Sequence, residues 1–224
     1  MVTLPGHVVA GSALADRPTE WPAREVARLD GRVASFVTEH VTAPGGQVLT
    51  RDWLRHPGAV AVIALDDRDR IAVLEQYRHP AGLTLVEPPA GLLDLAGESA
   101  WAAARRELAE EAQLQASDWR VLVDLFTSPG INQESIRVFL ARGLRSAPAP
   151  EGFVPEGEEA LMRVGWADLA ETLAGVLAGR LQSPTLVAGV LALWAARAGG
   201  GAGLDGLRPA DAPWPAREAK LARG

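Results

Sequence analysis

The run RRELAEEAQL, at residues 105–114, concentrates negative charge at one end of an expected helix. Ser99 is a typical N-cap residue, and residues 100–112 are rich in the strongest helix formers. Side chains three and four positions apart share one helix face, which brings three carboxylates together: those of Glu107, Glu110 and Glu111. Like charges at this spacing destabilise an isolated helix by about 0.2–0.5 kcal/mol per pair, so this end of the helix needs counter-ions.

Local arginines are the first candidates for that role. Arg105 and Arg106 precede the acidic cluster and are expected to point mainly away from its Glu107/Glu111 edge. The net charge of −6 and the pI near 5.3 give no support for a sequence-independent hold on nucleic acid. An anionic ligand would therefore need local arginines or a metal ion.

The composition bounds the class of protein. The 224 residues are 48% hydrophobic and 22% charged, which suffices for one well-packed domain with an added arm. The sequence has no cysteine, which excludes disulfides, thiolate zinc sites and cysteine nucleophiles. The first residues do not resemble a secretory signal, and the apolar run at 186–196 is too short to span a membrane. We therefore expect a cytoplasmic protein with no membrane partner.

Strand patterns surround the helix. Residues 33–41 and 47–54 flank a turn and predict a hairpin. Apolar runs at 58–65 and 70–78 have strand length and are expected at the centre of a sheet. Later segments continue the pattern, with strands at 119–126, 135–142 and 161–166 and helices at 167–180 and 183–198. This order predicts an α/β fold with a mixed sheet between helices.

The helix and its preceding loop, GLLDLAGESAWAAARRELAEEAQL at residues 91–114, resemble the Nudix box. Two positions depart from the family pattern. The loop after Gly91 holds one residue more than the pattern, which a loop tolerates cheaply. Gln113 replaces a glycine that would cap the helix in the left-handed conformation, at a cost of about 1 kcal/mol. The matching positions are Gly91, Glu98, Arg106, Glu107, Leu108, Glu110, Glu111 and Leu114.

The resemblance implies a Nudix-type α/β/α sandwich and a hydrolase that uses Mg²⁺, with Mn²⁺ able to substitute. Hard cations of this kind prefer carboxylate and carbonyl oxygens. The expected metal ligands are Glu107, Glu111 and the carbonyl of Ala90. Glu110 would be a further ligand or an orienting group. A merely solvated acidic helix end is the plainer interpretation, which the surrounding box disfavours.

The structural members of the box follow from the same resemblance. Glu98 would pair with Arg106 and hold the loop against the helix. Glu87 stands where a family glutamate contacts this same arginine. The catalytic set would comprise Arg106 and Glu110 together with a base from the acidic loop that follows the later strands. Glu158 and Glu159 are the favoured bases.

Further segments, within roughly residues 33–195, resemble the ADP-ribose pyrophosphatase branch of the family. One is SPGINQE at 128–134, where Pro129 lies fifteen residues beyond Leu114. Arg78 would reach the phosphate or the terminal ribose, and bidentate arginine suits phosphate geometry. Trp53 and Phe36 are the candidates for stacking on adenine. The expected substrate-binding residues are Arg51, Arg78, Phe36, Trp53, Ser128, Gly130 and Glu134.

The implied activity is hydrolysis of the pyrophosphate of ADP-ribose to AMP and ribose 5-phosphate. Two alternatives stay open: another nucleoside diphosphate sugar or dinucleotide (NADH, FAD, ADP-glucose), and a non-hydrolytic Nudix-fold ligand sensor. The resemblance also implies a homodimer with exchange of N-terminal strands. Three regions are expected: an arm at 1–57 for dimerisation and part of the nucleotide site, a catalytic domain at 58–198, and a flexible tail at 199–224.

Overall fold

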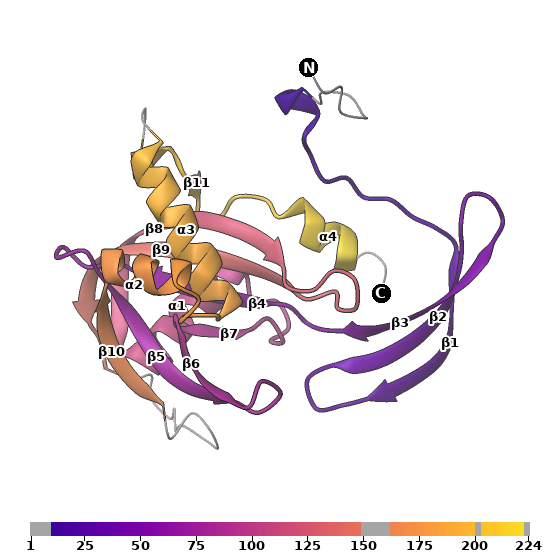
Figure 1. Ribbon diagram of the computed structural model, residues 1–224, viewed down its shortest axis with the longest axis horizontal. Helices are drawn as coiled ribbons and strands as arrows, with labels where there is room; N and C mark the ends of the chain where they lie inside the picture. The colour runs from indigo at the N-terminus through magenta and orange to yellow at the C-terminus, as the bar shows by residue number, and fades with distance from the viewer. Residues whose placement is uncertain (1–9, 149–161, 200–202, 222–224) are drawn as a thin grey trace.

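The computed structural model describes residues 10–148, 162–199 and 203–221. A body of sheets and helices carries a smaller sheet that projects to one side (Figure 1). In chain order the elements are η1 (Gly11–Ala13), β1 (Ala23–Asp30), β2 (Ser35–Thr42), β3 (Val48–Arg55), β4 (Ala59–Ala64), β5 (Arg70–Arg78), β6 (Leu83–Glu87), β7 (Ala90–Leu92), α1 (Ala100–Ala112), β8 (Leu114–Phe126), β9 (Ser135–Ser146), β10 (Arg163–Asp168), α2 (Leu169–Leu177), α3 (Pro184–Ala198), η3 (Gly203–Gly206), β11 (Arg208–Pro209) and α4 (Pro215–Leu221).

The body contains two sheets. One has five strands in the order β11-β8-β9-β4-β7, and the other has three in the order β10-β5-β6. Strand β4 pairs with β9 in parallel and with β7 antiparallel, so the larger sheet is mixed, as expected. The six residues of β4 are all buried, because the strand lies inside the sheet with both faces covered.

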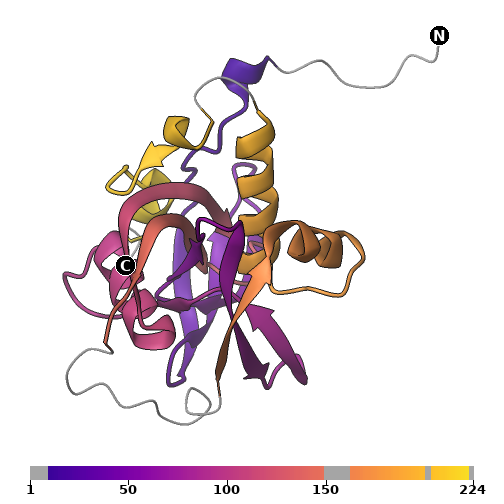
Figure 2. The same cartoon turned by 90° about the vertical axis from the view of Figure 1, so that its left-hand side faces the viewer.

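Alternate residues of β4 enter two different cores. Ala61 and Ile63 pack in a cluster with Leu186 and Val190 of α3. Val60 and Val62 enter a second cluster with Ala103, Ala104 and Leu108 of α1. Helices therefore cover opposite sides of the sheet, with α1 on one side and α2 and α3 on the other (Figure 2). This is the Nudix-type α/β/α sandwich predicted from the sequence.

The N-terminal arm is a three-stranded antiparallel sheet in the order β1-β2-β3. The predicted hairpin forms, with Phe36 of β2 opposite Leu54 of β3. Strand β1 adds to it, and Leu29 pairs with Phe36. The pairing of β1 shifts between Glu25 and Ala27, and all eight of its residues are exposed. Such a strand lacks apolar alternation, which explains why it was not predicted.

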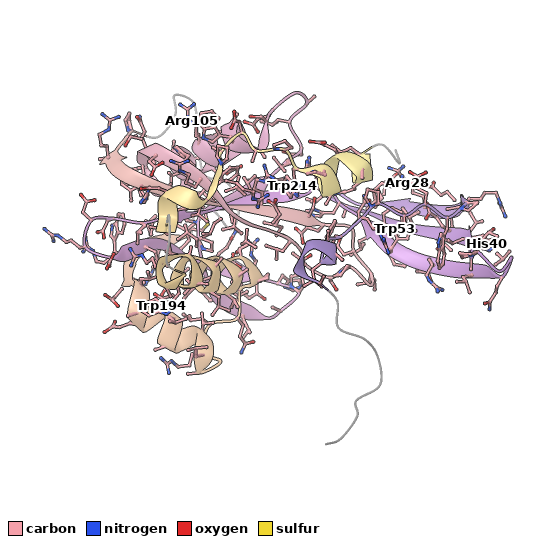
Figure 3. The ribbon with its side chains drawn as sticks, turned by 90° about the horizontal axis from the view of Figure 1, so that it is seen from above. Arg28, His40, Trp53, Arg105, Trp194 and Trp214 are labelled. Atoms are coloured by element: carbon pink, nitrogen blue, oxygen red, sulfur yellow. The ribbon has the colours of Figure 1, made fainter. Side chains whose placement is uncertain are left out.

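The segment after α3 differs from the expected flexible tail. Residues 203–221 carry η3, β11 and α4, and β11 pairs with β8 at the edge of the larger sheet. Trp214 is 6% exposed and lies on the body near α4 (Figure 3). Isolated anchor residues hold this segment, and they leave no periodic pattern in the sequence. Within the described residues, no helix is long and apolar enough to cross a membrane.

Candidate active site

Helix α1 begins and ends as its sequence requires. The Ser99 side chain accepts a hydrogen bond from the N–H of Ala102, which confirms the predicted N-cap. Leu108 is fully buried and packs against the larger sheet. At the other end, Gln113 adopts φ 54° and ψ 42°. The left-handed C-cap of the family is therefore kept without its glycine.

The box arginine lies among the carboxylates. Arg106 binds both oxygens of Glu98 at 3.0 Å, as predicted. It also donates to Glu107 at 2.7 Å and to Glu110 at 2.9 Å, so the expectation that Arg106 points away from the cluster was wrong. The hydrogen bonds to Glu98, with the charge of Glu107, raise the pKa of Arg106. One permanent cation thus offsets much of the repulsion within the cluster.

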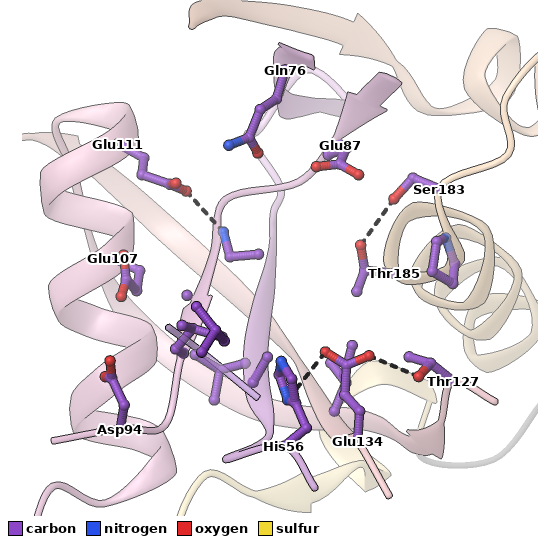
Figure 4. A pocket seen from close by; sticks show the side chains of 18 of the residues that line it. His56, Gln76, Glu87, Asp94, Glu107, Glu111, Thr127, Glu134, Ser183 and Thr185 are labelled. Carbon is purple, nitrogen blue, oxygen red and sulfur yellow. Dashed lines mark hydrogen bonds and ion pairs between the residues drawn. The ribbon is translucent and has the colours of Figure 1, made fainter. Parts of the chain in front are cut away.

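Two of the expected metal ligands meet where the start of β7 lies beside the end of α1. The N–H of Ala90 donates to a carboxylate oxygen of Glu111 at 2.8 Å. Glu107 packs against Gly91, where a β-carbon would overlap its carboxylate. The absence of a β-carbon at Gly91 therefore leaves room for the Glu107 carboxylate in its observed position. Figure 4 shows Glu107 and Glu111 on the same side of a pocket.

This pocket, with a volume of about 730 Å³, gathers most of the predicted chemistry. Oxygen donors of the kind that Mg²⁺ prefers line it, so the residues present fit that ion. Among the described residues, no three acidic or histidine side chains converge closely enough to hold a metal by themselves. Mg²⁺ usually takes one or two protein carboxylates and completes its shell with water and substrate phosphate. The predicted residues that line the pocket are Arg78, Ala90, Arg106, Glu107, Glu110, Glu111 and Glu134.

Arg78 forms an ion pair with Glu87, which the sequence analysis had expected to contact Arg106. Glu87, which is 6% exposed, accepts two hydrogen bonds from Arg78, at 2.7 and 3.0 Å. The expected contact of Glu87 with Arg106 is thus replaced by a contact with Arg78. Strands β5 and β6 are antiparallel neighbours, which brings the two side chains together. A fixed guanidinium that is still partly exposed can face an anion in the pocket.

A second pocket, of about 870 Å³, lies between the arm and the body. Arg51, Trp53 and Gly130, predicted to bind substrate, line it. The Trp53 indole donates to Glu39 at 3.1 Å, and the guanidinium of Arg55 lies 5.3 Å from the ring centroid. Trp53 therefore has one edge fixed by hydrogen bonding.

Some predicted residues are not brought to either pocket. Phe36 and Ser128 line neither pocket. Phe36 instead lies between Leu29 and Leu54 in an apolar row across the three strands of the arm. Glu158 and Glu159, the expected bases, lie outside the described residues. Glu134 lines the first pocket but accepts a hydrogen bond from Thr127 at 2.7 Å.

Histidine 56 was not predicted, although it lines both pockets. Its Nδ1 accepts the N–H of Gly58 at 3.0 Å and lies 3.6 Å from a carboxylate oxygen of Glu134. Burial is the main cause that lowers the pKa of His56, so the ring is neutral at neutral pH. A single histidine after a strand carries no spacing signal, so only the structure identifies its position.

Comparison with known proteins agrees with this geometry. The model of the NUDIX domain matches residues 55–184, more than half of the chain. The chain therefore belongs to the Nudix family. An ADP-ribose pyrophosphatase from Mycobacterium tuberculosis is 46% identical over 82% of this chain and 86% of its own length.

A second sequence relative and a solved structure are also similar to this chain. A methanol dehydrogenase activator from Bacillus methanolicus is 42% identical over 51% of this chain and 61% of its own length. The crystal structure of an ADP compounds hydrolase has a TM-score of 0.62 at 22% identity, over 80% of this chain and 95% of that one. This structural likeness shows that the fold is shared.

Proposed function

We propose that the protein hydrolyses the pyrophosphate of ADP-ribose to AMP and ribose 5-phosphate, with Mg²⁺ as cofactor. One observation carries the proposal: a single pocket joins the box carboxylates to two arginines, Arg78 and Arg106. The 46% identical ADP-ribose pyrophosphatase, matched over most of its length, supports the choice of substrate. The arrangement suits a ligand that carries adjacent phosphates and arrives with divalent cations.

The oxygen donors of the pocket would hold the metal. Glu107, Glu111 and the carbonyl of Ala90 are the proposed ligands, and Glu110 orients Arg106 at 2.9 Å. Bound Mg²⁺ would polarise the diphosphate and lower the pKa of a coordinated water. The Nudix residues Glu98 and Arg106 keep the helix and its loop in register through two hydrogen bonds.

Arg78 would receive the phosphate or the terminal ribose. Its guanidinium side chain is 44% exposed while Glu87 holds it on one side. A positioned arginine loses less side-chain entropy on binding than a free one. The base that takes a proton from the attacking water is proposed to be Glu158 or Glu159. Arg51, Trp53 and Gly130 would contact the nucleoside in the second pocket.

The direct test uses purified full-length protein with ADP-ribose and Mg²⁺, and measures released AMP. Formation of equal amounts of AMP and ribose 5-phosphate supports the proposal. A panel with ADP-glucose, NADH and FAD would rank kcat/KM among related substrates. If every compound binds and none is cleaved, the chain is a ligand sensor and the hydrolase proposal fails.

We also propose a homodimer that forms through the arm, with exchange of N-terminal strands. Leu29, Phe36 and Leu54 lie directly opposite one another across the three strands, so they share one face. All three are exposed, Leu29 at 73%. An apolar row on a projecting sheet fits a surface that a second copy covers. A cytoplasmic location remains a prediction of the sequence.

A further inference from the structure

Three consecutive carbonyl groups are held where the chain passes from the arm into the body. The carbonyl of His56 accepts a hydrogen bond from Lys220 at 2.7 Å, and that of Pro57 accepts one from Arg217 at 2.5 Å. The carbonyl of Gly58 accepts the N–H of Leu93 at 3.0 Å. We call residues 56–58 the crossing segment. Two of its three carbonyl partners come from helix α4, near the end of the chain.

Helix α4 is itself anchored to the body. Trp214, just before α4, is buried, and the guanidinium of Arg137 lies 4.7 Å from its ring centroid. Arg137 is 3% exposed, donates to the carbonyls of Ala212 and Pro213, and pairs with Asp124. Because the anchor is a buried arginine in β9 of the larger sheet, α4 is fixed relative to that sheet. The crossing segment is therefore fixed as well.

The crossing segment determines how the ring of His56 is presented. Nδ1 accepts the N–H of Gly58, so the proton of the neutral imidazole resides on Nε2. Gly58 has φ 93°, a conformation that requires glycine and turns its N–H back to this ring. Nε2–H has no protein partner among the described residues. His56 lines both the pocket of the box carboxylates and the pocket that contains Arg51 and Trp53.

On this geometry, we infer that His56 is a substrate-binding residue that donates its Nε2–H to the nucleotide half of the substrate. We further infer that Lys220 and Arg217 are positioning residues, which act through the backbone of the crossing segment. The inference rests on the proposed function, because it identifies a contact with the same nucleotide. A residue shared by two adjoining pockets is suited to a ligand that spans both.

Two substitutions of His56 separate the proposed contact from a structural role. His56→Gln keeps a donor near the position of Nε2, whereas His56→Asn keeps an acceptor near the position of Nδ1 for the N–H of Gly58. AMP is the probe, and its Kd is measured by calorimetry without divalent metal. We expect His56→Asn to weaken AMP binding by roughly tenfold, as for one lost hydrogen bond to a charged group, and His56→Gln to recover most of it. If His56→Gln binds AMP no better than His56→Asn, the donor assignment is overturned.

Lys220 is tested by its own pair of variants. Lys220→Arg keeps a donor for the His56 carbonyl, and Lys220→Met removes it while keeping much of the apolar stem. We expect Lys220→Met to raise KM for ADP-ribose several-fold with kcat within about twofold, and Lys220→Arg to restore KM. Arg197→Met, which breaks an exposed ion pair with Asp69 on the body, is the matched control. An unchanged KM in Lys220→Met would overturn the positioning role.

The two proposals fail in distinguishable ways. If the unmodified protein does not cleave ADP-ribose, the proposed function fails, whatever the variants do. If the unmodified protein cleaves ADP-ribose but the two His56 variants bind AMP equally well, only the inference about the crossing segment fails. Circular dichroism and thermal unfolding of each variant identify any that have lost the fold, and Lys220→Arg then serves as the folded reference.

Discussion

The N–H of Ala90 donates to the carboxylate of Glu111 at 2.8 Å, across 21 residues of sequence. This bond joins the strand that follows β6 to the end of α1, and it places the Ala90 carbonyl and the Glu111 carboxylate beside one pocket. A carboxylate that accepts a backbone N–H is held in one orientation by that bond. The bond thus preorganises two of the proposed metal ligands, which come from different elements.

Glu111→Gln is expected to abolish turnover. The amide can still meet the N–H of Ala90 through its oxygen, so the fold should persist, but it lacks the charge that a divalent cation needs. Since metal ions contribute several kcal/mol of transition-state stabilisation, we expect kcat to fall by at least about a hundredfold. AMP release and Mg²⁺ titration measure the two effects. Unchanged turnover would contradict the proposed role of Glu111 as a metal ligand.

Gly91→Ala is expected to impair metal binding more than stability. Gly91 does not require a positive φ, so alanine fits the backbone. Its methyl group would overlap the carboxylate of Glu107, which is the movable end of a side chain. We expect Glu107 to be displaced, with activity lowered at least tenfold and a small change in the melting temperature. Recovery of activity at high Mg²⁺ or Mn²⁺ would support displacement, whereas equal losses of fold and activity would contradict it.

Gln113→Gly is expected to stabilise the protein. Gln113 holds φ 54°, where its β-carbon crowds the backbone, and glycine removes that strain. The gain of about 1 kcal/mol is reduced by roughly half because glycine is freer in the unfolded chain, so we expect a net gain of about 0.5 kcal/mol. Urea unfolding measures the free energy, and Gln113→Ala is the control because it keeps the β-carbon. A destabilised glycine variant would mean that the Gln113 side chain itself stabilises the fold.

These features differ in how far the sequence reveals them. Helix α1 and its Ser99 cap follow from local propensity and spacing, so the sequence predicts both. The pairing of Glu87 with Arg78 depends on which strands become neighbours, which the box pattern does not report. The docking of α4 depends on single anchors such as Trp214, which carry no period. The sequence therefore predicts elements that depend on neighbouring residues, but it does not predict which distant residues become partners.

Leu29→Asp is expected to convert a dimer to a monomer. The side chain is 73% exposed in one chain and lies at the end of the apolar row of the arm. A carboxylate buried there without a partner would cost several kcal/mol in the interface. Sedimentation equilibrium measures the association. Leu177→Asp on α2 is the matched control, because Leu177 is also 73% exposed but lies on the body. A monomeric unmodified protein would contradict the arm interface.

The pKa of the Lys220 amine can be measured directly and reports on its burial beside the crossing segment. Lys220 is the single lysine of the chain, so isotope-labelled methylation of its amine gives one side-chain NMR signal besides that of the N-terminus. Burial, with the charge of Arg217, lowers the pKa of Lys220 to about 8. We expect this signal to titrate near pH 8 and to be absent in Lys220→Arg. A titration near the ordinary value of 10.5 would mean that the amine is not buried beside Arg217.

The same ionisation predicts a pH dependence of stability. Between pH 8 and pH 10.5 the unfolded chain keeps the proton on Lys220 that the folded chain has lost, so the free energy of unfolding should rise with pH across this window. Below pH 8 the amine is charged in both states, and its contribution is constant. The comparison is between the unmodified protein and Lys220→Met by urea unfolding at pH 7 and pH 10. Because the methionine variant lacks the group, the unmodified protein should gain stability relative to it at the higher pH. A relative loss of stability would mean that the folded state does not lower the pKa of Lys220.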